Sequence, residues 1–190
     1  MPSSPSSSTR MAVASLSALL LSLLATSCQD DQARIDELLD QGRAFTDQQQ
    51  FPEAIIEFRS LLQLDPNHAE AHHLLANAYM QTQQPQEAIW EYGETVRLDP
   101  GNLNARISLG ALFLVFKKYA EVEEQALAVI ELAPDDAKGH ALLGPALEGL
   151  ERGDEAESLY LKAIELDPET GQYLFILASY YNREGNRAAA

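Results

Sequence analysis

Apolar residues recur at helical spacing along the chain from Asp30 onward, and proline or asparagine marks the breaks between them. Residues three and four apart share one face of an α-helix, so the pattern predicts amphipathic helices in consecutive pairs. One tripeptide at the breaks recurs every 34 residues: Leu-Asp-Pro at 64–66, 98–100 and 166–168, and Leu-Ala-Pro at 132–134. A fixed period of this length predicts stacked copies of one helical pair.

Small and large residues also follow this period when each repeat is numbered so that its proline is position 32. Position 8 is always small: Gly42, Ala76, Gly110, Gly144 and Ala178. Position 20 reads Ala54, Ala88, Val122 and Ala156. Short side chains at both positions allow two antiparallel helices to approach closely. Position 24 is aromatic except at Ala126 (Phe58, Tyr92 and Tyr160), and we expect these rings to fill the space between neighbouring pairs.

Polar residues predict where the helices begin. Asn67, Asn102 and Asp136 follow the turns and are expected to be N-caps. A glutamate recurs in the first turn of each second helix, at Glu53, Glu87, Glu121 and Glu155. Each carboxylate there faces the positive end of the helix dipole, an interaction of typically ~0.3–1 kcal/mol.

Leucine at position 7, the small residue at 8, a large one at 11, alanine at 20, an aromatic at 24 and proline at 32 together resemble the tetratricopeptide repeat. The resemblance implies an all-α solenoid of antiparallel helix pairs in a right-handed superhelix. Its full repeats would span residues 35–68, 69–102, 103–136 and 137–170, preceded by a tether over 28–34. The chain departs from the family at position 4, where His72, Arg106 and His140 replace bulky apolar residues, and at Val122 and Ala126.

Residues 171–190 make an incomplete fifth repeat that lacks its second helix. Either the chain is a fragment of a longer repeat protein, or an apolar face is left without a cover. In the second case we expect Tyr173, Phe175, Leu177 and Tyr180 to be exposed.

The resemblance also implies a binding surface, because positions 2, 5, 9 and 12 of each first helix line the concave face in this family. Those positions carry Asp36, Leu39, Arg43 and Thr46; Glu70, His73, Asn77 and Met80; Asn104, Ile107, Ala111 and Leu114; and Lys138, Ala141, Pro145 and Glu148. This mixed surface with an apolar middle suits an extended peptide or a partner helix. A clamp for a C-terminal carboxylate, found in some members, is not expected, because its positions include Leu39, Leu74 and Ser108.

The N-terminal residues 1–27 have the layout of a cleaved signal peptide. Their uncharged apolar stretch, residues 11–25, is shorter than the roughly 20 residues that cross a membrane as a helix. Small residues then precede Cys28, and residues 25–28 resemble the lipobox of bacterial lipoproteins. This resemblance implies an acylated Cys28 and an exported protein, and Gln29 favours the outer membrane, facing the periplasm. The alternative is an ordinary secretory cleavage site that releases a soluble exported protein.

Composition excludes several other functions. With 13 basic and 29 acidic residues, the chain has a formal charge of −16 and lacks the clustered cations of a nucleic-acid-binding surface. One cysteine excludes an internal disulfide and a Cys-based zinc site. His68, His72 and His73 lack the ligand spacing of zinc proteases, so no metal is expected. No phosphate loop or nucleophile motif is found, so neither a cofactor nor an enzymatic activity is expected.

These observations predict a membrane-anchored, non-catalytic scaffold that binds a peptide or partner protein in an envelope or export assembly. The lipobox, acidic body and turn spacing are similar to the tetratricopeptide lipoproteins of PEP-CTERM systems. Two alternatives stay open: a pilotin-like lipoprotein that assists secretin or pilus assembly, and a regulatory domain of a longer protein.

Overall fold

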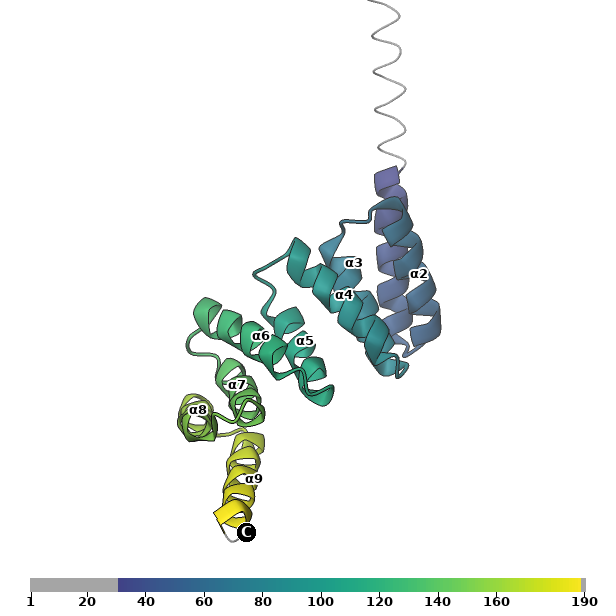
Figure 1. Cartoon of the computed structure of the whole chain (residues 1–190). Helices are drawn as coiled ribbons and strands as arrows, with labels where there is room; N and C mark the ends of the chain where they lie inside the picture. Colours follow the sequence, from purple (N-terminus) through teal and green to yellow (C-terminus); the bar gives the residue numbers. More distant parts are fainter. Residues whose placement is uncertain (1–30, 189–190) are drawn as a thin grey trace, which may run out of the picture. The chain divides into compact units, whose positions relative to one another are not determined.

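The computed structural model describes residues 31–188, and every regular element in that part of the chain is an α-helix. A helix over residues 31–47 comes first (Figure 1). It is followed by α2 (Phe51–Leu64), α3 (Ala69–Gln81), α4 (Pro85–Leu98), α5 (Leu103–Val115), α6 (Tyr119–Leu132), α7 (Ala137–Gly149), α8 (Gly153–Leu166) and α9 (Gly171–Ala188). The predicted all-α solenoid class is confirmed. The predicted leader and Cys28 lie outside the described residues.

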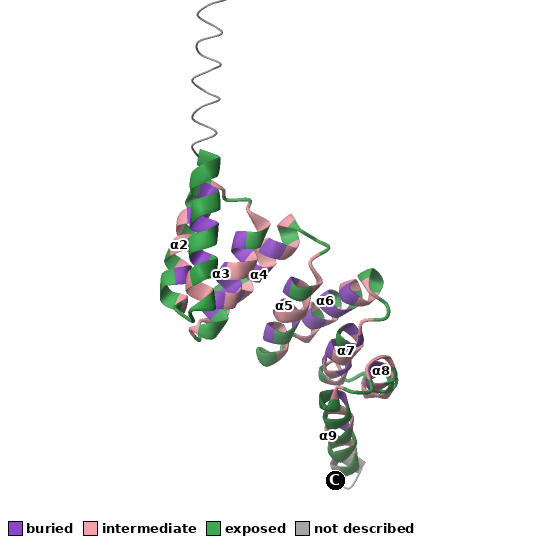
Figure 2. Cartoon of the chain, turned by 180° about the vertical axis from the view of Figure 1, so that it is seen from behind, coloured by how far each residue is buried: buried purple, intermediate pink, exposed green. Residues whose placement is uncertain are grey.

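The chain divides into two compact units, Met1–Pro66 and Asn67–Ala190. The described part of the first unit is the helix over residues 31–47 together with α2. In the second unit α3 packs on α4, α5 on α6, and α7 on α8. Successive pairs within this unit meet through α4 and α5, α6 and α7, and α8 and α9. Figure 2 shows the consequence, because each helix has a buried face and an exposed one.

One tight turn joins the two helices of every full pair. Its central residue has a left-handed backbone, with φ of 57° to 61°, at Gln49, Gln83, Lys117 and Glu151. The amide of the residue after it donates a hydrogen bond to the carbonyl of the large residue at position 11. Gln84 donates to Tyr79 at 2.9 Å, and Lys118 donates to Phe113 at 2.8 Å. This hydrogen bond satisfies a carbonyl that the end of the helix leaves without a partner. The same turn therefore sets the antiparallel return in four consecutive pairs.

The predicted helix starts are confirmed except at one residue. Asn102 accepts from the Ala105 amide at 3.0 Å, and Asp136 accepts from the Lys138 amide at 2.9 Å. The cap of α3 is His68 and not Asn67, because the cap lies two residues after the proline in each turn. The Nδ1 atom of His68 accepts from the Ala71 amide at 3.2 Å. All four predicted glutamates lie in the first turn of a second helix.

Glycine at position 8 admits the ring at position 24 of the same pair. A Cβ atom on Gly144 would clash with the buried Tyr160 ring, and one on Gly42 would clash with Phe58. The rings therefore fill the space within a pair, where the sequence placed them between pairs. Tyr160 also reaches the next repeat, since its ring centroid lies 5.6 Å from that of Tyr180.

The third repeat replaces the missing ring with a residue from its neighbour. Ala126 stands where the aromatic would be, and a Cβ atom on Gly110 would lie 2.6 Å from Cδ2 of Leu142. Leu142 belongs to α7 of the following repeat and is buried in the same cluster as Ala126. The departure at Ala126 is thus compensated in packing.

The polar residues at position 4 form hydrogen bonds within their own repeat or with the turn that precedes it. Nδ1 of His72 lies 2.6 Å from a Glu91 carboxylate oxygen, and Arg106 donates to the Gln125 side chain at 2.9 Å. Arg106 also donates to the carbonyl of Pro100 at 2.8 Å, and His140 Nε2 lies 3.1 Å from that of Pro134. Polar side chains at this position therefore connect the two helices of a pair or connect a helix to the turn before it.

The incomplete fifth repeat buries part of its apolar surface. Tyr173 and Tyr180 are buried, so the expectation that both lie exposed is wrong. Tyr173 packs with Ala137 and Ala163, and the Tyr180 hydroxyl donates to the Gly153 carbonyl at 3.1 Å. Phe175 is exposed as expected. Among the described helices, none combines the length and the hydropathy that crossing a membrane requires.

Candidate partner-binding groove

Two hollows in the second unit lie along the first helices of its repeats. The α3–α5 hollow has a volume of about 380 Å³, and the α5–α9 hollow has a volume of about 500 Å³. Val115, at the end of α5, lines both hollows. We call the two hollows together the groove.

The α3–α5 hollow has no charged side chain in its lining. Its walls are Asn77, Met80, Gln81, Tyr92, Ser108, Ala111, Leu112 and Val115. Met80, Ala111 and Leu112 contribute apolar atoms to it, and Asn77 and Gln81 contribute amides. Such a lining accepts an apolar side chain together with the polar backbone that carries it.

Asn77 is held in a fixed orientation by a neighbouring tyrosine. The Tyr92 hydroxyl donates to Oδ1 of Asn77 at 2.6 Å. Burial raises the pKa of Tyr92, and a hydrogen bond with the Ser108 side chain opposes that rise. The Tyr92 ring also meets His73 edge-on, with ring centroids 5.7 Å apart. This hydrogen bond orients the Asn77 amide. Its NH₂ group can then donate to a ligand.

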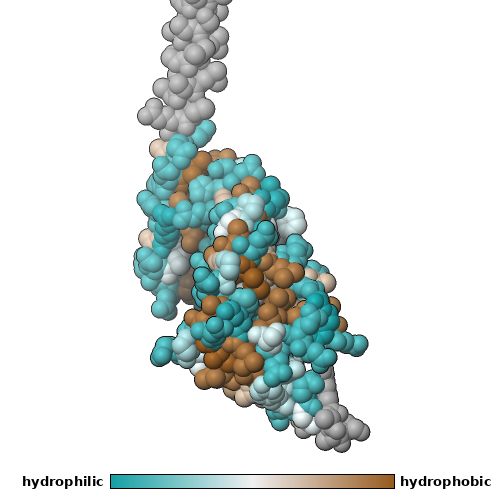
Figure 3. Space-filling model, turned by 90° about the vertical axis from the view of Figure 1, so that its left-hand side faces the viewer, coloured by the Kyte–Doolittle hydropathy of each residue, from teal (hydrophilic) through white to brown (hydrophobic). Residues whose placement is uncertain are grey.

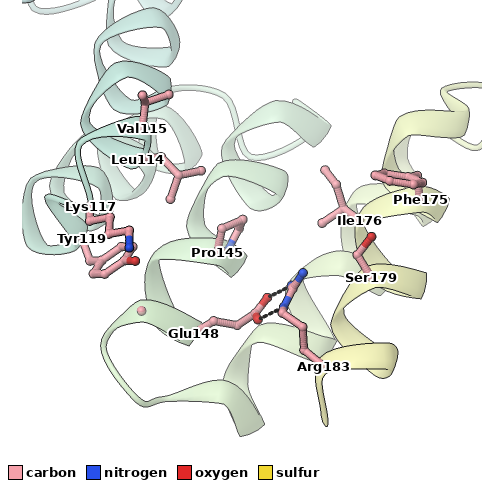
Figure 4. Close-up of a pocket in the computed structure, with 11 residues that line it drawn as sticks. Leu114, Val115, Lys117, Tyr119, Pro145, Glu148, Phe175, Ile176, Ser179 and Arg183 are labelled. Carbon is pink, nitrogen blue, oxygen red and sulfur yellow. Dashed lines mark hydrogen bonds and ion pairs between the residues drawn. The ribbon is translucent and has the colours of Figure 1, made fainter. Parts of the chain in front are cut away.

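The α5–α9 hollow is lined from three first helices, one turn and the start of α6 (Figure 4). Its residues are Leu114, Val115, Lys117, Tyr119, Pro145, Glu148, Gly149, Phe175, Ile176, Ser179 and Arg183. Two large apolar side chains at its edge are mostly exposed, Val115 at 74% and Phe175 at 73%. Gly149 and Tyr119 pack closely in the lining, because a Cβ atom on Gly149 would lie 2.5 Å from the Tyr119 ring.

The Glu148 carboxylate in this hollow already forms an ion pair with Arg183. Arg183 donates to both Glu148 oxygens, from Nε at 3.0 Å and from Nη2 at 2.8 Å, and Figure 4 shows this pair joining α7 to α9. The Tyr160 hydroxyl also donates to Glu148. Burial and the Glu148 carboxylate raise the pKa of Tyr160, and Glu148 raises the pKa of Arg183. Glu148 therefore keeps its charge paired while it forms part of the wall.

The structure brings four of the predicted groove residues to these hollows. Asn77, Met80 and Ala111 line the α3–α5 hollow, and Leu114 lines the α5–α9 hollow. Five other predicted residues line neither hollow. Glu70, Asn104 and Lys138, at position 2, are exposed, and His73 and Ile107, at position 5, are half-buried. That any of these residues contacts a partner stays a prediction.

Two predicted groove residues lie in the first unit. Leu39 is only 9% exposed, so its side chain belongs to a buried face and leaves little surface for a partner. Arg43 is exposed and lies 3.5 Å from the Asp40 carboxylate. The hollows described above lie within the second unit.

Sequence reasoning missed the residues at position 13. Gln81, Val115, Gly149 and Arg183 all line a hollow, each four residues after a position-9 residue. Residues four apart share a helix face, so this spacing was a usable signal. The α9 residues Phe175, Ile176 and Ser179 were also missed, because groove positions were assigned only in the full repeats.

A third hollow, of about 420 Å³, lies between α6, α7 and α8, away from the groove residues. Leucines 127, 143, 147 and 159 contribute to its lining. Arg152 borders it and pairs with Glu123 at 2.6 Å and Glu155 at 2.7 Å, which raises the pKa of Arg152. Apolar side chains likewise gather in patches bordered by hydrophilic ones on the face shown in Figure 3.

Side chains that could bind a metal ion are dispersed over the described residues. No group of three or more histidine, cysteine, aspartate or glutamate side chains there is placed to hold a metal ion. His72, the centre of the histidine cluster in the sequence, pairs with Glu91.

Sequence models of one repeat family match most of the chain. A model described as TPR repeat matches residues 42–83, and one described as tetratricopeptide repeat matches residues 74–137 and 141–190. No curated protein sequence matches the chain.

Several solved structures are similar to this one in fold. MamA from Desulfovibrio magneticus RS-1 is 23% identical with a TM-score of 0.74, over 82% of this chain and 88% of that one. YrrB is 19% identical with a TM-score of 0.69, over 79% of this chain and 77% of that one. PilF from Pseudomonas aeruginosa is 20% identical with a TM-score of 0.66, over 83% of this chain and 72% of that one.

Proposed function

The chain belongs to the tetratricopeptide-repeat family. From this premise we propose that it is a non-catalytic scaffold that holds a peptide or helix of a partner protein in the groove along α3, α5, α7 and α9. Repeats of this kind stack into extended surfaces that serve binding. The structural neighbour YrrB is described as a TPR protein with an unusual peptide-binding site, which supports the same class of ligand here.

The uncharged α3–α5 hollow is the observation that carries this proposal. It combines apolar walls with the fixed amide of Asn77, whose nitrogen can donate to a backbone carbonyl of a bound segment. Met80 and Val115 are exposed next to it, and exposed apolar residues grouped around a hollow are typical of a binding surface. A peptide supplies the matching groups, an apolar side chain and a polar backbone.

The test is to fill the α3–α5 hollow and measure the loss of partners. Ala111→Arg places a long charged side chain at an exposed position in the hollow wall. Ala120→Arg makes the same change at an exposed position of α6 that lines no hollow. In affinity capture from cells of the source organism, we expect partners of the wild type to be retained by Ala120→Arg and lost by Ala111→Arg. Equal recovery by both variants would show that the groove is not the binding surface.

We also propose that this scaffold is exported and acylated on Cys28, which would place its groove at the bacterial envelope. The support is sequence alone: an uncharged apolar stretch followed by small residues and the single cysteine of the chain. Several acyl chains on one residue would anchor the protein stably, since each buried CH₂ contributes ~0.8 kcal/mol. Globomycin should cause the uncleaved precursor to accumulate, and Cys28→Ser should move the protein out of the membrane fraction. Unchanged processing and unchanged fractionation would contradict the anchor.

A further inference from the structure

We propose that the α5–α9 hollow is an acid-selective subsite: it takes a large apolar side chain of the partner beside a carboxylate, and Lys117 binds that carboxylate. This inference rests on the proposed function, because the hollow is part of the groove. It adds the chemistry of the ligand, a segment in which an aromatic or aliphatic residue adjoins an aspartate, a glutamate or a chain end.

The apolar half of this ligand follows from the walls of the hollow. Leu114, Pro145 and Ile176 line it from three different helices, with Val115 and Phe175 exposed at its edge. Figure 4 shows Leu114, Pro145 and Ile176 around one space between α5, α7 and α9. With a volume of about 500 Å³, the hollow has room for a side chain the size of phenylalanine or leucine. Covering Val115 and Phe175 would remove exposed apolar surface from water, which favours binding.

Lys117 supplies a cation at the edge of the hollow. It is the left-handed residue of the α5–α6 turn, with φ of 57°, so its backbone is fixed between two helices. Its side chain is exposed, and no carboxylate among the described residues pairs with it. The neighbouring Lys118 differs, because it pairs with Glu121 at 3.7 Å and lies over the Phe113 ring. Lys117 is therefore available to a ligand.

Arg183 is the other cation in the lining. Its Nε and Nη2 atoms hold Glu148, and the other terminal nitrogen of the half-exposed guanidinium is not part of that pair. The Glu148 side chain is only 10% exposed and is covered by Arg183 and the Tyr160 hydroxyl. A ligand in the hollow therefore meets two cations and one carboxylate that is already paired. The chain as a whole carries a charge of −16, so this local balance is opposite in sign to that of the molecule.

The neighbouring α3–α5 hollow provides an internal comparison. It lies on the same face and shares Val115, yet no charged residue lines it. An acidic group is attracted by Lys117 in the α5–α9 hollow and meets no cation in the lining of the α3–α5 hollow. The groove should thus prefer partners in one orientation, with the acidic end of the bound segment toward α9.

Three small probes of matched shape test the proposal on the full chain by NMR. Phenylpropionate carries the carboxylate, phenylpropanamide is its neutral counterpart, and phenylpropylammonium carries the opposite charge. We expect phenylpropionate to shift resonances of residues that line the α5–α9 hollow and to bind roughly threefold to tenfold more tightly than the amide, with the ammonium weakest. Equal affinity of the three probes, or no shifts at this hollow, would overturn the subsite.

Two variants with the same change in net charge separate contact from the general field. Lys117→Gln should bring phenylpropionate down to the affinity of phenylpropanamide. Lys162→Gln removes an exposed cation of α8 that lines no hollow, and it should leave the preference intact. Phe175→Ser should weaken both probes, because it removes part of the apolar wall. If Lys117→Gln and Lys162→Gln behave alike, Lys117 does not bind the carboxylate.

Failure of this subsite and failure of the proposed function are distinguishable. The Ala111→Arg capture experiment concerns the uncharged hollow and contains no step that depends on Lys117. Partner loss in Ala111→Arg together with equal binding of the three probes would leave the scaffold standing and remove the acid preference.

Discussion

Tyr160 determines which residue α7 can carry opposite its ring. The ring is buried, and Gly144 faces it so closely that a Cβ atom would clash with three ring atoms. Phe58 and Gly42 repeat this arrangement in the first unit. The period in the sequence predicted a small residue at position 8. The packing shows that the aromatic ring at position 24 occupies the space beside it.

Gly144→Ala should therefore destabilise the protein although alanine favours helices. We expect a loss of about 1–3 kcal/mol, because the surrounding core must shift to admit one methyl group. Gly93→Ala in α4 is the control, because no atom lies within 4 Å of the added Cβ. This variant should gain roughly 1 kcal/mol of stability from the higher helix propensity of alanine. Urea unfolding followed by circular dichroism measures both changes. Equal midpoints for the two variants would contradict this packing.

His73 should make the stability of the second unit depend on pH. Burial lowers its pKa below the ordinary 6.5, and the Glu70 carboxylate only partly opposes this. The unfolded chain then binds a proton before the folded one does, so this contribution to stability is complete above pH 6.5 and declines as the pH falls from 6.5 toward the folded pKa.

The variant His73→Phe keeps an aromatic ring beside Tyr92 and lacks the titrating group. Relative to this variant, the wild type should lose unfolding free energy between pH 7 and pH 5. Parallel curves for the two proteins over that interval would show that His73 does not titrate differently on folding.

At the scale of the elements, the turns carry a conformational strain that recurs in every pair. Gln49, Gln83, Lys117 and Glu151 all adopt left-handed φ values that side chains disfavour. The strain persists because the following amide caps the preceding helix, as Gln84 does for Tyr79 at 2.9 Å. None of these residues is glycine, so composition alone did not indicate where the left-handed residue lies.

Gln83→Gly should stabilise the second unit. Glycine adopts the left-handed conformation without the steric cost of roughly 1–2 kcal/mol, and part of this gain is offset by its greater backbone entropy when unfolded. We expect a net gain of about 0.5–1 kcal/mol in the free energy of unfolding. Gln86→Gly inside α4 should cost about 1 kcal/mol in the same assay. A loss of stability on Gln83→Gly would show that its side chain contributes more than its backbone costs.

At the scale of the whole molecule, the repeat period allowed the helix pairs to be predicted because their stacking depends on local spacing. The site was less predictable. Asn77, Met80, Ala111 and Leu114, at positions 9 and 12, line the hollows, whereas Leu39, at position 5, is buried. The contribution of α9 depends on contacts between repeats, such as Arg183 with Glu148, which no single repeat encodes.

Histidine at position 68 illustrates the same limit at a helix end. Asn67 has the side chain that statistics favour as a cap, yet the geometry of the turn gives that role to His68. The position in the turn, two residues after proline, was the stronger signal.

Site-specific photocrosslinking can show directly whether the groove of the second unit binds a partner protein. A benzophenone amino acid at position 111 lies in the wall of the α3–α5 hollow, and one at position 120 lies on α6, where it lines no hollow. The account predicts a discrete crosslinked partner from position 111 in living cells and none from position 120. Crosslinking of the same partner from position 120 and not from 111 would contradict it.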